Sequence, residues 1–163
     1  MMNKLKGLIA TVMLMSISTF AQSIQLNQVY SLDSQSARTL LDAAVVACQK
    51  IQHNIAVVVV DRGGNTLMAN RHETVGPHNL GAAEKKAYTA LSTKMETLLL
   101  SQNVHENKDA KNLTTLSNLL LLGGGIPVRY ENQVVGAIGV AGAGGAKNDH
   151  YCAETAVQSI FNP

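Results

Sequence analysis

The sequence predicts an α+β domain in which helices pack across a mainly antiparallel, five-stranded sheet. Two hairpin patterns, with helical patterns before, between and after them, indicate this class. Residues 55–60 are an unbroken run of β-branched and small apolar residues, which is typical of a strand covered on both faces. Turn residues over 61–65 and a second strand over 66–70 complete the first hairpin.

A second hairpin is predicted further along the chain. Residues 126–130 and 134–140 have strand patterns, and Glu131-Asn132 supplies a two-residue reversal between them. The apolar run of residues 119–122 comes just before, so this half is predicted to hold two or three strands. A Gly/Ala-rich loop over residues 141–147 follows.

Apolar residues spaced by three and four predict the helices. The first carries its apolar face over residues 37–51, and Asp33 or Ser34 is in place to cap its start. A second helical pattern covers residues 80–98, and residues 98–100 either end that helix or begin another. Residues 101–112 are polar, and we expect a surface loop or a short exposed helix there.

The last predicted helix begins with Asn148 or Asp149 as its cap. The first and last helices each carry one cysteine, Cys48 and Cys152. In an oxidising compartment these two residues can form one disulfide. The alternative is two buried thiols that act as small apolar side chains, and the sequence leaves both open.

The N-terminal segment has the layout of a secretory signal peptide. Lys4 and Lys6 form a basic start, residues 8–17 are almost entirely apolar, and small residues precede a cut expected after Ala21. We therefore expect a signal peptide over residues 1–21, a single domain over residues 22–163, and a periplasmic or secreted protein without a membrane span. An uncleaved anchor or a core helix is the alternative.

Composition excludes a nucleic-acid partner. The 163 residues are 46% hydrophobic and 15% charged, as in a globular domain, but only 4% are aromatic and none is tryptophan. The chain has 13 basic and 11 acidic residues, and loss of Lys4 and Lys6 would leave it close to neutral. Lys85-Lys86 is the only adjacent basic pair, which is too little to neutralise a row of phosphates.

Four segments in order carry a family resemblance that covers residues 34–160. They are Ala56-Val57-Val58-Val59-Val60-Asp61-Arg62-Gly63-Gly64-Asn65, Gly76-Pro77-His78-Asn79 with Lys85-Lys86-Ala87-Tyr88-Thr89-Ala90, Gly123-Gly124-Gly125-Ile126-Pro127-Val128, and Val135-Gly136-Ala137-Ile138-Gly139-Val140-Ala141-Gly142 with Asn148-Asp149. Together they resemble the GlcG/HbpS-like haem-binding family, which is similar to the C-terminal domain of PduO-type proteins. The resemblance implies a compact domain of profilin-like layout, symmetric oligomers, and haem or a related tetrapyrrole as ligand in some members.

His78 is the main candidate for a ligand-binding side chain. It stands with Asn79 just before a predicted helix, where backbone N–H groups and the helix dipole favour an anion. Imidazole binds metals, so His78 is also the candidate axial ligand of a haem. A histidine that only stabilises the turn is the alternative. His150, at the mouth of the second glycine-rich loop, is a further candidate, with an exposed first-turn residue as its alternative.

Further candidate ligand-binding residues come from one helix face and one glycine-rich bend. Lys86 and Thr89 lie three apart, so both could reach one pocket. Gly123, Gly124 and Gly125 allow close approach of the backbone to a ligand, or merely sharp turns and subunit contacts. Neither glycine-rich segment fits a phosphate loop or a dinucleotide fingerprint, and no zinc-type spacing or nucleophile motif occurs.

The function expected from the sequence is therefore binding of a small ligand, haem or a related tetrapyrrole, with no catalytic residue assigned. One alternative is an enzyme that acts on a small anionic metabolite at the His78-Asn79 helix start. Another is a structural or regulatory oligomer whose glycine-rich loops serve subunit contacts. Whatever the function, we expect a homo-oligomer, because the Gly-rich strand ends and the apolar run 119–122 suggest surface buried between subunits. The binding hypothesis requires that the His78 turn and both glycine-rich bends meet in one recess.

Overall fold

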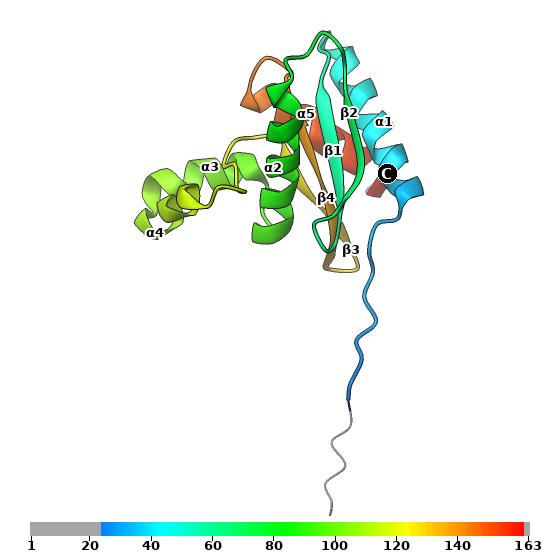
Figure 1. Ribbon diagram of the computed structural model, residues 1–163, viewed down its shortest axis with the longest axis vertical. Helices are drawn as coiled ribbons and strands as arrows, with labels where there is room; N and C mark the ends of the chain where they lie inside the picture. The colour runs from blue at the N-terminus through cyan, green and yellow to red at the C-terminus, as the bar shows by residue number, and fades with distance from the viewer. Residues whose placement is uncertain (1–23, 162–163) are drawn as a thin grey trace, which may run out of the picture.

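The computed structural model describes residues 24–161, so the predicted signal peptide lies outside the described range (Figure 1). The elements follow in the order α1 (Ser34–Lys50), β1 (Ala56–Asp61), β2 (Thr66–Arg71), α2 (His78–Thr93), α3 (Thr97–Glu106), α4 (Lys108–Lys111), the 3₁₀ helix η1 (Asn112–Thr115), β3 (Gly125–Tyr130), β4 (Gln133–Ala141) and α5 (Ala146–Phe161). This order confirms the α+β class. No helix in the described range is long and apolar enough to cross a bilayer.

The sheet has four strands within the described residues, in the order β2-β1-β4-β3, and all neighbours are antiparallel. Both predicted hairpins form, but the predicted count of five strands is wrong. Residues 119–122 stay outside the sheet because helix side chains bind their backbone. The Leu120 N–H donates to Thr89 Oγ1 (2.8 Å), and Thr97 Oγ1 donates to the Leu122 carbonyl oxygen (2.7 Å).

Helices cover both faces of the sheet and make three layers. Figure 1 shows α1 and α5 on one face and α2 on the other. Alternate side chains of β1 serve opposite faces, as strand geometry requires. Val57 and Val59 join the core under α1 and α5, whereas Val58 and Val60 join the core under α2. This pattern confirms the prediction of a strand buried on both sides.

Small residues allow α2 to pack closely against the sheet. Its alanines Ala83, Ala87 and Ala90 are completely buried. A Cβ at Gly139 of β4 would collide with the Ala83 carbonyl oxygen, so this position needs glycine for the close approach. The same face of α2 also carries the polar side chains of Lys86 and Thr89, which are buried there away from water.

The starts of α1 and α5 differ in how well the sequence predicted them. Asp33 caps α1 as expected, because its Oδ1 accepts from the Ser36 N–H at 2.8 Å. Helix α5 begins at Ala146, so the prediction that Asn148 or Asp149 caps it is wrong. Both side chains lie in the first turn and reach back to Ala143: Asn148 Nδ2 donates to its carbonyl oxygen, and Asp149 Oδ1 accepts from its N–H, each at 2.8 Å.

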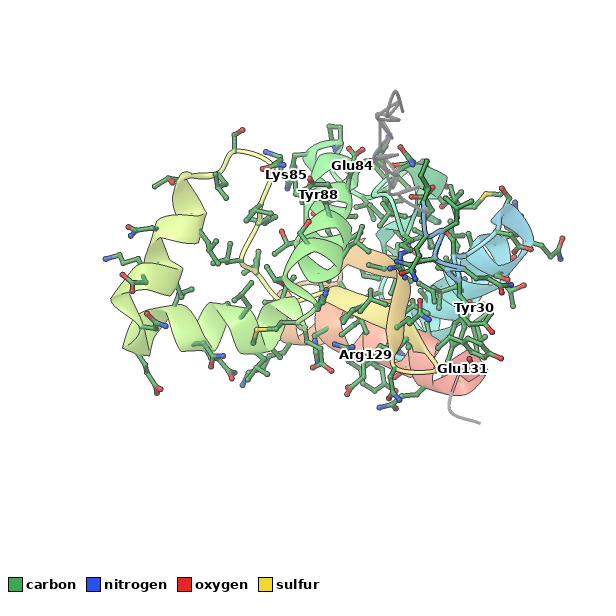
Figure 2. All side chains as sticks on the ribbon, turned by 90° about the horizontal axis from the view of Figure 1, so that it is seen from below. Tyr30, Glu84, Lys85, Tyr88, Arg129 and Glu131 are labelled. Atoms are coloured by element: carbon green, nitrogen blue, oxygen red, sulfur yellow. A yellow bond between two sulfur atoms is a disulfide. The ribbon has the colours of Figure 1, made fainter. Side chains whose placement is uncertain are left out.

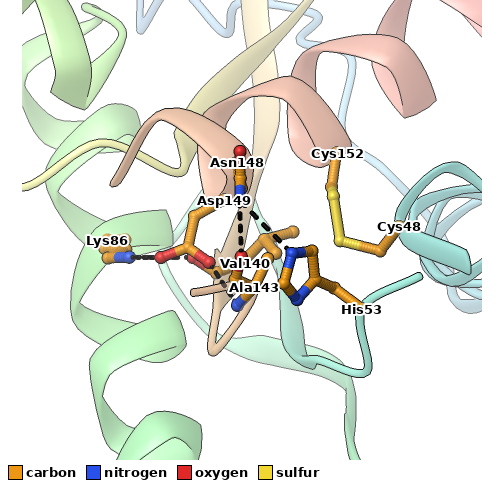
Figure 3. Close-up of a disulfide and its surroundings, with 8 residues drawn as sticks. All are labelled: Cys48, His53, Lys86, Val140, Ala143, Asn148, Asp149 and Cys152. Carbon is orange, nitrogen blue, oxygen red and sulfur yellow. Dashed lines mark hydrogen bonds and ion pairs between the residues drawn. A yellow bond between two sulfur atoms is a disulfide. The ribbon is translucent and has the colours of Figure 1, made fainter. Parts of the chain in front are cut away.

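A disulfide joins α1 to α5. Cys48 and Cys152 are bonded, with Cα atoms 5.2 Å apart, so of the two alternatives that the sequence left open the covalent one holds (Figure 3). Both residues are completely buried.

Residues 97–122 form an arm beside α2, and Figure 1 shows its helices α3 and α4 projecting away from the sheet. The polar stretch 101–112, predicted as a loop or short exposed helix, forms the end of α3 and α4. The arm exposes large apolar side chains, with Leu99, Leu116 and Leu122 each more than 40% accessible. Such a surface is typical of one that meets another protein.

Candidate functional site

A buried ion pair between α2 and α5 lies among the predicted site residues. Lys86 is only 1% exposed, and its Nζ donates to Asp149 Oδ2 at 2.7 Å and to the Val140 carbonyl oxygen at 3.0 Å (Figure 3). Burial lowers the pKa of Lys86, and the Asp149 carboxylate opposes this by stabilising the ammonium. Lys86 therefore links α2, β4 and α5 and does not face solvent.

The triple-glycine bend packs against this ion pair. Gly124 has a φ of +120°, and a Cβ there would lie 3.1 Å from Lys86 Nζ and collide with the Val140 carbonyl oxygen. A Cβ at Gly125 would collide with the Lys86 carbonyl oxygen, and one at Gly123 would lie 2.7 Å from the carbonyl oxygen of Ala146. The space beside the bend is thus filled by protein backbone and by the lysine.

Thr89 lies one turn beyond Lys86 and is completely buried. Its Oγ1 donates to the Lys85 carbonyl oxygen at 2.7 Å and accepts from the Leu120 N–H at 2.8 Å. Both hydrogen-bonding directions of the hydroxyl are therefore used within the chain. Thr89 fixes the segment that returns from the arm to the sheet.

His78 stands apart from this buried group. It is exposed at the first turn of α2, and in the described part of the chain its side chain has no hydrogen bond or ion pair. Lys86 is eight positions further along α2, which is about 12 Å along a helix. Its neighbour Asn79 does meet the second glycine-rich bend, since a Cβ at Gly142 would lie 3.5 Å from Asn79 Cγ. The two glycine-rich bends therefore meet at Asp149, which also accepts a hydrogen bond from the Ala143 N–H, whereas the exposed His78 lies outside this buried group.

His150 faces a different surface from the Lys86 pair. Its Nε2 lies 3.7 Å from Glu96 Oε2 and 3.8 Å from Glu154 Oε2, while its buried Nδ1 has no hydrogen-bond partner among the residues that the structure describes. Glu96 and Glu154 line a hollow of about 280 Å³ together with Ile126, Pro127, Arg129, Val157 and Gln158. His150 and His78 thus belong to separate environments.

A second hollow, which sequence reasoning missed, lies at the C-terminal end of α2. Arg62, Lys94 and Arg129 surround adjoining spaces of about 260 and 200 Å³, which we call the basic hollow. Tyr88, Leu91 and Val134 provide its apolar wall, and Figure 2 shows where Tyr88 and Arg129 lie. These residues come from segments far apart in the sequence, so no local pattern could have revealed them.

Neutral groups hold two of these cations in place. Arg62 Nη1 donates to Gln133 Oε1 at 3.0 Å, and Arg129 Nη2 donates to the Lys94 carbonyl oxygen at 2.7 Å. Among the described residues, none of the three cations forms an ion pair with a carboxylate. The basic hollow can therefore receive an anion without breaking an existing pair.

Comparison with known proteins identifies the family. Residues 32–158, nearly all of the packed domain, match the family model described as haem degrading protein HbpS-like. The chain belongs to the HbpS-like family. GlcG of Escherichia coli K12 is 31% identical over 110 residues, which cover 68% of this chain and 81% of GlcG.

Solved structures agree with this membership of the HbpS-like family. A double mutant of Streptomyces reticuli HbpS superimposes with a TM-score of 0.78 at 32% identity, covering 89% of this chain and 97% of that one. A complex of PduOC with haem gives 0.73 at 26% identity, covering 80% and 96%. The resemblance found in the four sequence motifs is thereby confirmed.

Proposed function

We propose that this chain is a haem-binding protein. The observation that carries the proposal is the HbpS-like match over residues 32–158, which spans the sheet and the helices on both its faces. A structure of a relative that is 26% identical contains haem, and 96% of that chain is covered by this one. Haem needs only one or two axial donors and an apolar surface, which a fold of this size can supply.

We propose His78 as the axial ligand. Its imidazole is exposed, and no hydrogen bond or ion pair with a described residue would have to break before iron binds. Lys86, Thr89 and the three glycines would then act indirectly, by fixing α2 and the bend beside it. The competing location is the basic hollow, where Arg62 and Arg129 would bind propionates and Tyr88 would offer an oxygen donor.

These two locations can be separated, because His78 and Lys94 stand at opposite ends of α2, about 24 Å apart. Titration of the purified chain with hemin should give a saturable, shifted Soret band at about one haem per chain. His78→Ala should weaken binding about tenfold or more and change the spectrum. His72→Ala is the matched control, since His72 is a nearby histidine already bonded to Thr74.

Three results would count against parts of this proposal. An unchanged spectrum in His78→Ala together with a changed one in Tyr88→Phe would move the iron to the basic hollow. Equal losses in the His72 and His78 variants would remove the specific role of His78. A hemin titration without saturation would overturn haem binding itself.

A second candidate function is haem degradation, which the description of the matching family favours. Haem-loaded protein would be exposed to air with a reductant, with an iron chelator as indicator. Loss of the Soret band with release of iron, absent from free hemin under the same conditions, would support an enzyme. A stable band would support a binding protein.

We also propose that the protein works outside the cytoplasm. The Cys48–Cys152 disulfide supports this, because such bonds persist in oxidising compartments. The pattern of residues 1–21 supports it as well. N-terminal sequencing of protein recovered from the periplasm or medium should begin at Gln22, and a start at Met1 would contradict the proposal.

A further inference from the structure

Three potential metal ligands converge beside α5, away from His78, the proposed haem ligand. His150 and Glu154 lie four apart on α5, so they project from the same helix face. The third potential ligand is Glu96, which is the N-cap residue of α3. One donor atom from each of the three residues lies within 4.8 Å of the others.

The environment of these residues differs from that of an ordinary surface ion pair. The His150 side chain is only 13% exposed, so packing holds the ring in place, and its Nε2 faces both carboxylates. Neither carboxylate pairs with a lysine or arginine among the described residues, and Arg129 of the same hollow donates instead to the Lys94 carbonyl oxygen. Two negative charges thus flank one imidazole nitrogen, and a cation between them would be stabilised.

The donor set suits a transition metal better than calcium or magnesium. One imidazole nitrogen and two carboxylate oxygens are ligands that Zn²⁺ and its neighbours accept. Bonds of about 2.0–2.2 Å in a tetrahedral site place donors about 3.3–3.5 Å apart, so distances of 3.7 and 3.8 Å need to shrink only slightly. Glu96 and Glu154 also line the hollow of about 280 Å³, where an open position can take water or a ligand.

We propose that Glu96, His150 and Glu154 bind a divalent transition-metal ion of the Zn²⁺ class, with an open coordination position facing the hollow. This site is separate from the proposed haem function and goes beyond it. Within residues 24–161, His150 Nδ1 has no acceptor that would orient the ring, which should weaken the metal affinity about 10–100-fold relative to a site with such support.

The test uses tag-free, full-length mature protein treated with a chelator and then titrated with Zn²⁺ and with Co²⁺. We expect about one ion per chain, a rise in melting temperature, and a visible Co²⁺ spectrum of low symmetry. Glu154→Gln and His150→Gln should each weaken binding about tenfold or more. His72→Gln is the matched control, because His72 lies 3.6 Å from one carboxylate, that of Glu73, but belongs to no group of three potential ligands among the described residues.

The variants must also be compared without metal, so that a folding defect is not mistaken for loss of a ligand. Equal melting temperatures of the apo forms, with the metal-induced rise lost only in the two triad variants, would support the site. Unchanged metal binding in both variants, or no binding at 100-fold excess of metal, would overturn it. Glu154→Gln should bind hemin like the parent protein, so this result is independent of the haem proposal.

Discussion

The Lys86 ammonium is buried away from water, and it donates hydrogen bonds to Asp149 and to the Val140 carbonyl oxygen instead. A charged amine is tolerated in such a position only when its partners are retained. The pair also fixes the glycine-rich loop, because the second carboxylate oxygen of Asp149 accepts a hydrogen bond from the Ala143 N–H. One residue pair therefore ties α2 to the start of α5.

Lys86→Met should lower the free energy of unfolding by about 3–5 kcal/mol, because it leaves the Asp149 carboxylate buried and unpaired. Lys85→Met, on the exposed side of the same turn, should change it by less than about 0.5 kcal/mol. Adding Asp149→Asn to Lys86→Met should recover part of the loss, since it removes the buried charge. Urea unfolding of the four proteins tests this, and equal costs for the two lysines would contradict it.

Asp61 gives a prediction for pH dependence. Its Oδ1 accepts from the backbone N–H groups of Gly63 and Asn65, and the Asn65 side chain donates to both of its oxygens. Hydrogen bonds, led by that from the Asn65 side chain, lower the pKa of Asp61 below its usual 3.8. The folded state then binds fewer protons than the unfolded state, so this stabilisation is present above 3.8 and is lost as the pH falls through the folded-state pKa.

Asp61→Asn keeps an acceptor but cannot titrate. The stability difference between the parent and this variant should be largest near neutral pH and should shrink as the pH falls below about 4. Unfolding curves collected between neutral and strongly acidic pH provide the measurement. A difference that stays constant with pH would show that the charge has no part in the turn.

At the scale of elements, the sequence predicted those helices and strands whose buried residues recur with a regular period. Hairpins and amphipathic helices were correct because a strand or helix with one buried face records its period in the residue pattern. The prediction of a fifth strand was wrong because an apolar run alone does not make a strand: the backbone at Leu120 and Leu122 is bound by the Thr89 and Thr97 side chains, so it does not pair with the sheet. The predicted start of α5 was wrong because Asn148 and Asp149 lie inside its first turn, where their side chains form hydrogen bonds with the backbone of Ala143.

The candidate site could be predicted only in pieces. Lys86 and the three glycines were each singled out from the sequence, but only the fold shows that they are neighbours in space. Their role in packing, the exposure of His78 and the basic hollow depend on contacts between distant segments. The spacing of His150 and Glu154 was visible in the sequence, but Glu96 could be placed beside them only by the fold.

The disulfide should contribute strongly to the stability of the α1–α5 pair. It joins residues 104 positions apart, so it removes much chain entropy from the unfolded state. Replacing Cys48 and Cys152 by alanine should lower the free energy of unfolding by about 2–5 kcal/mol. Reductant should lower the free energy of unfolding of the parent by a comparable amount and leave that of the variant unchanged. An unfolding curve of the parent that does not change with reductant would contradict this.

At the scale of the molecule, the arm leaves apolar surface in water. Leu99, Leu116 and Leu122 are 44–49% exposed, and we propose that a second copy of this chain covers them. Light scattering should report a multiple of the mature mass. The double variant Leu99→Gln, Leu116→Gln should shift the measured mass toward that of the monomer without unfolding the sheet and the helices that cover it.

Val46→Gln is the control for this shift, because Val46 is 52% exposed but lies on α1, away from the arm. It should leave the assembly unchanged. A parent protein that is monomeric at all concentrations, or equal shifts in both variants, would remove the arm as the interface.

The bond between α1 and α5 has a consequence for the arm that lies between them in the chain. A protease cutting once near residues 107–116 would produce two polypeptides that remain covalently attached through Cys48 and Cys152. Such nicked protein would migrate as one band without reductant and as two bands with it. Since the sheet and its covering helices would stay together, the arm is the natural place to graft a foreign peptide or a fluorescent reporter.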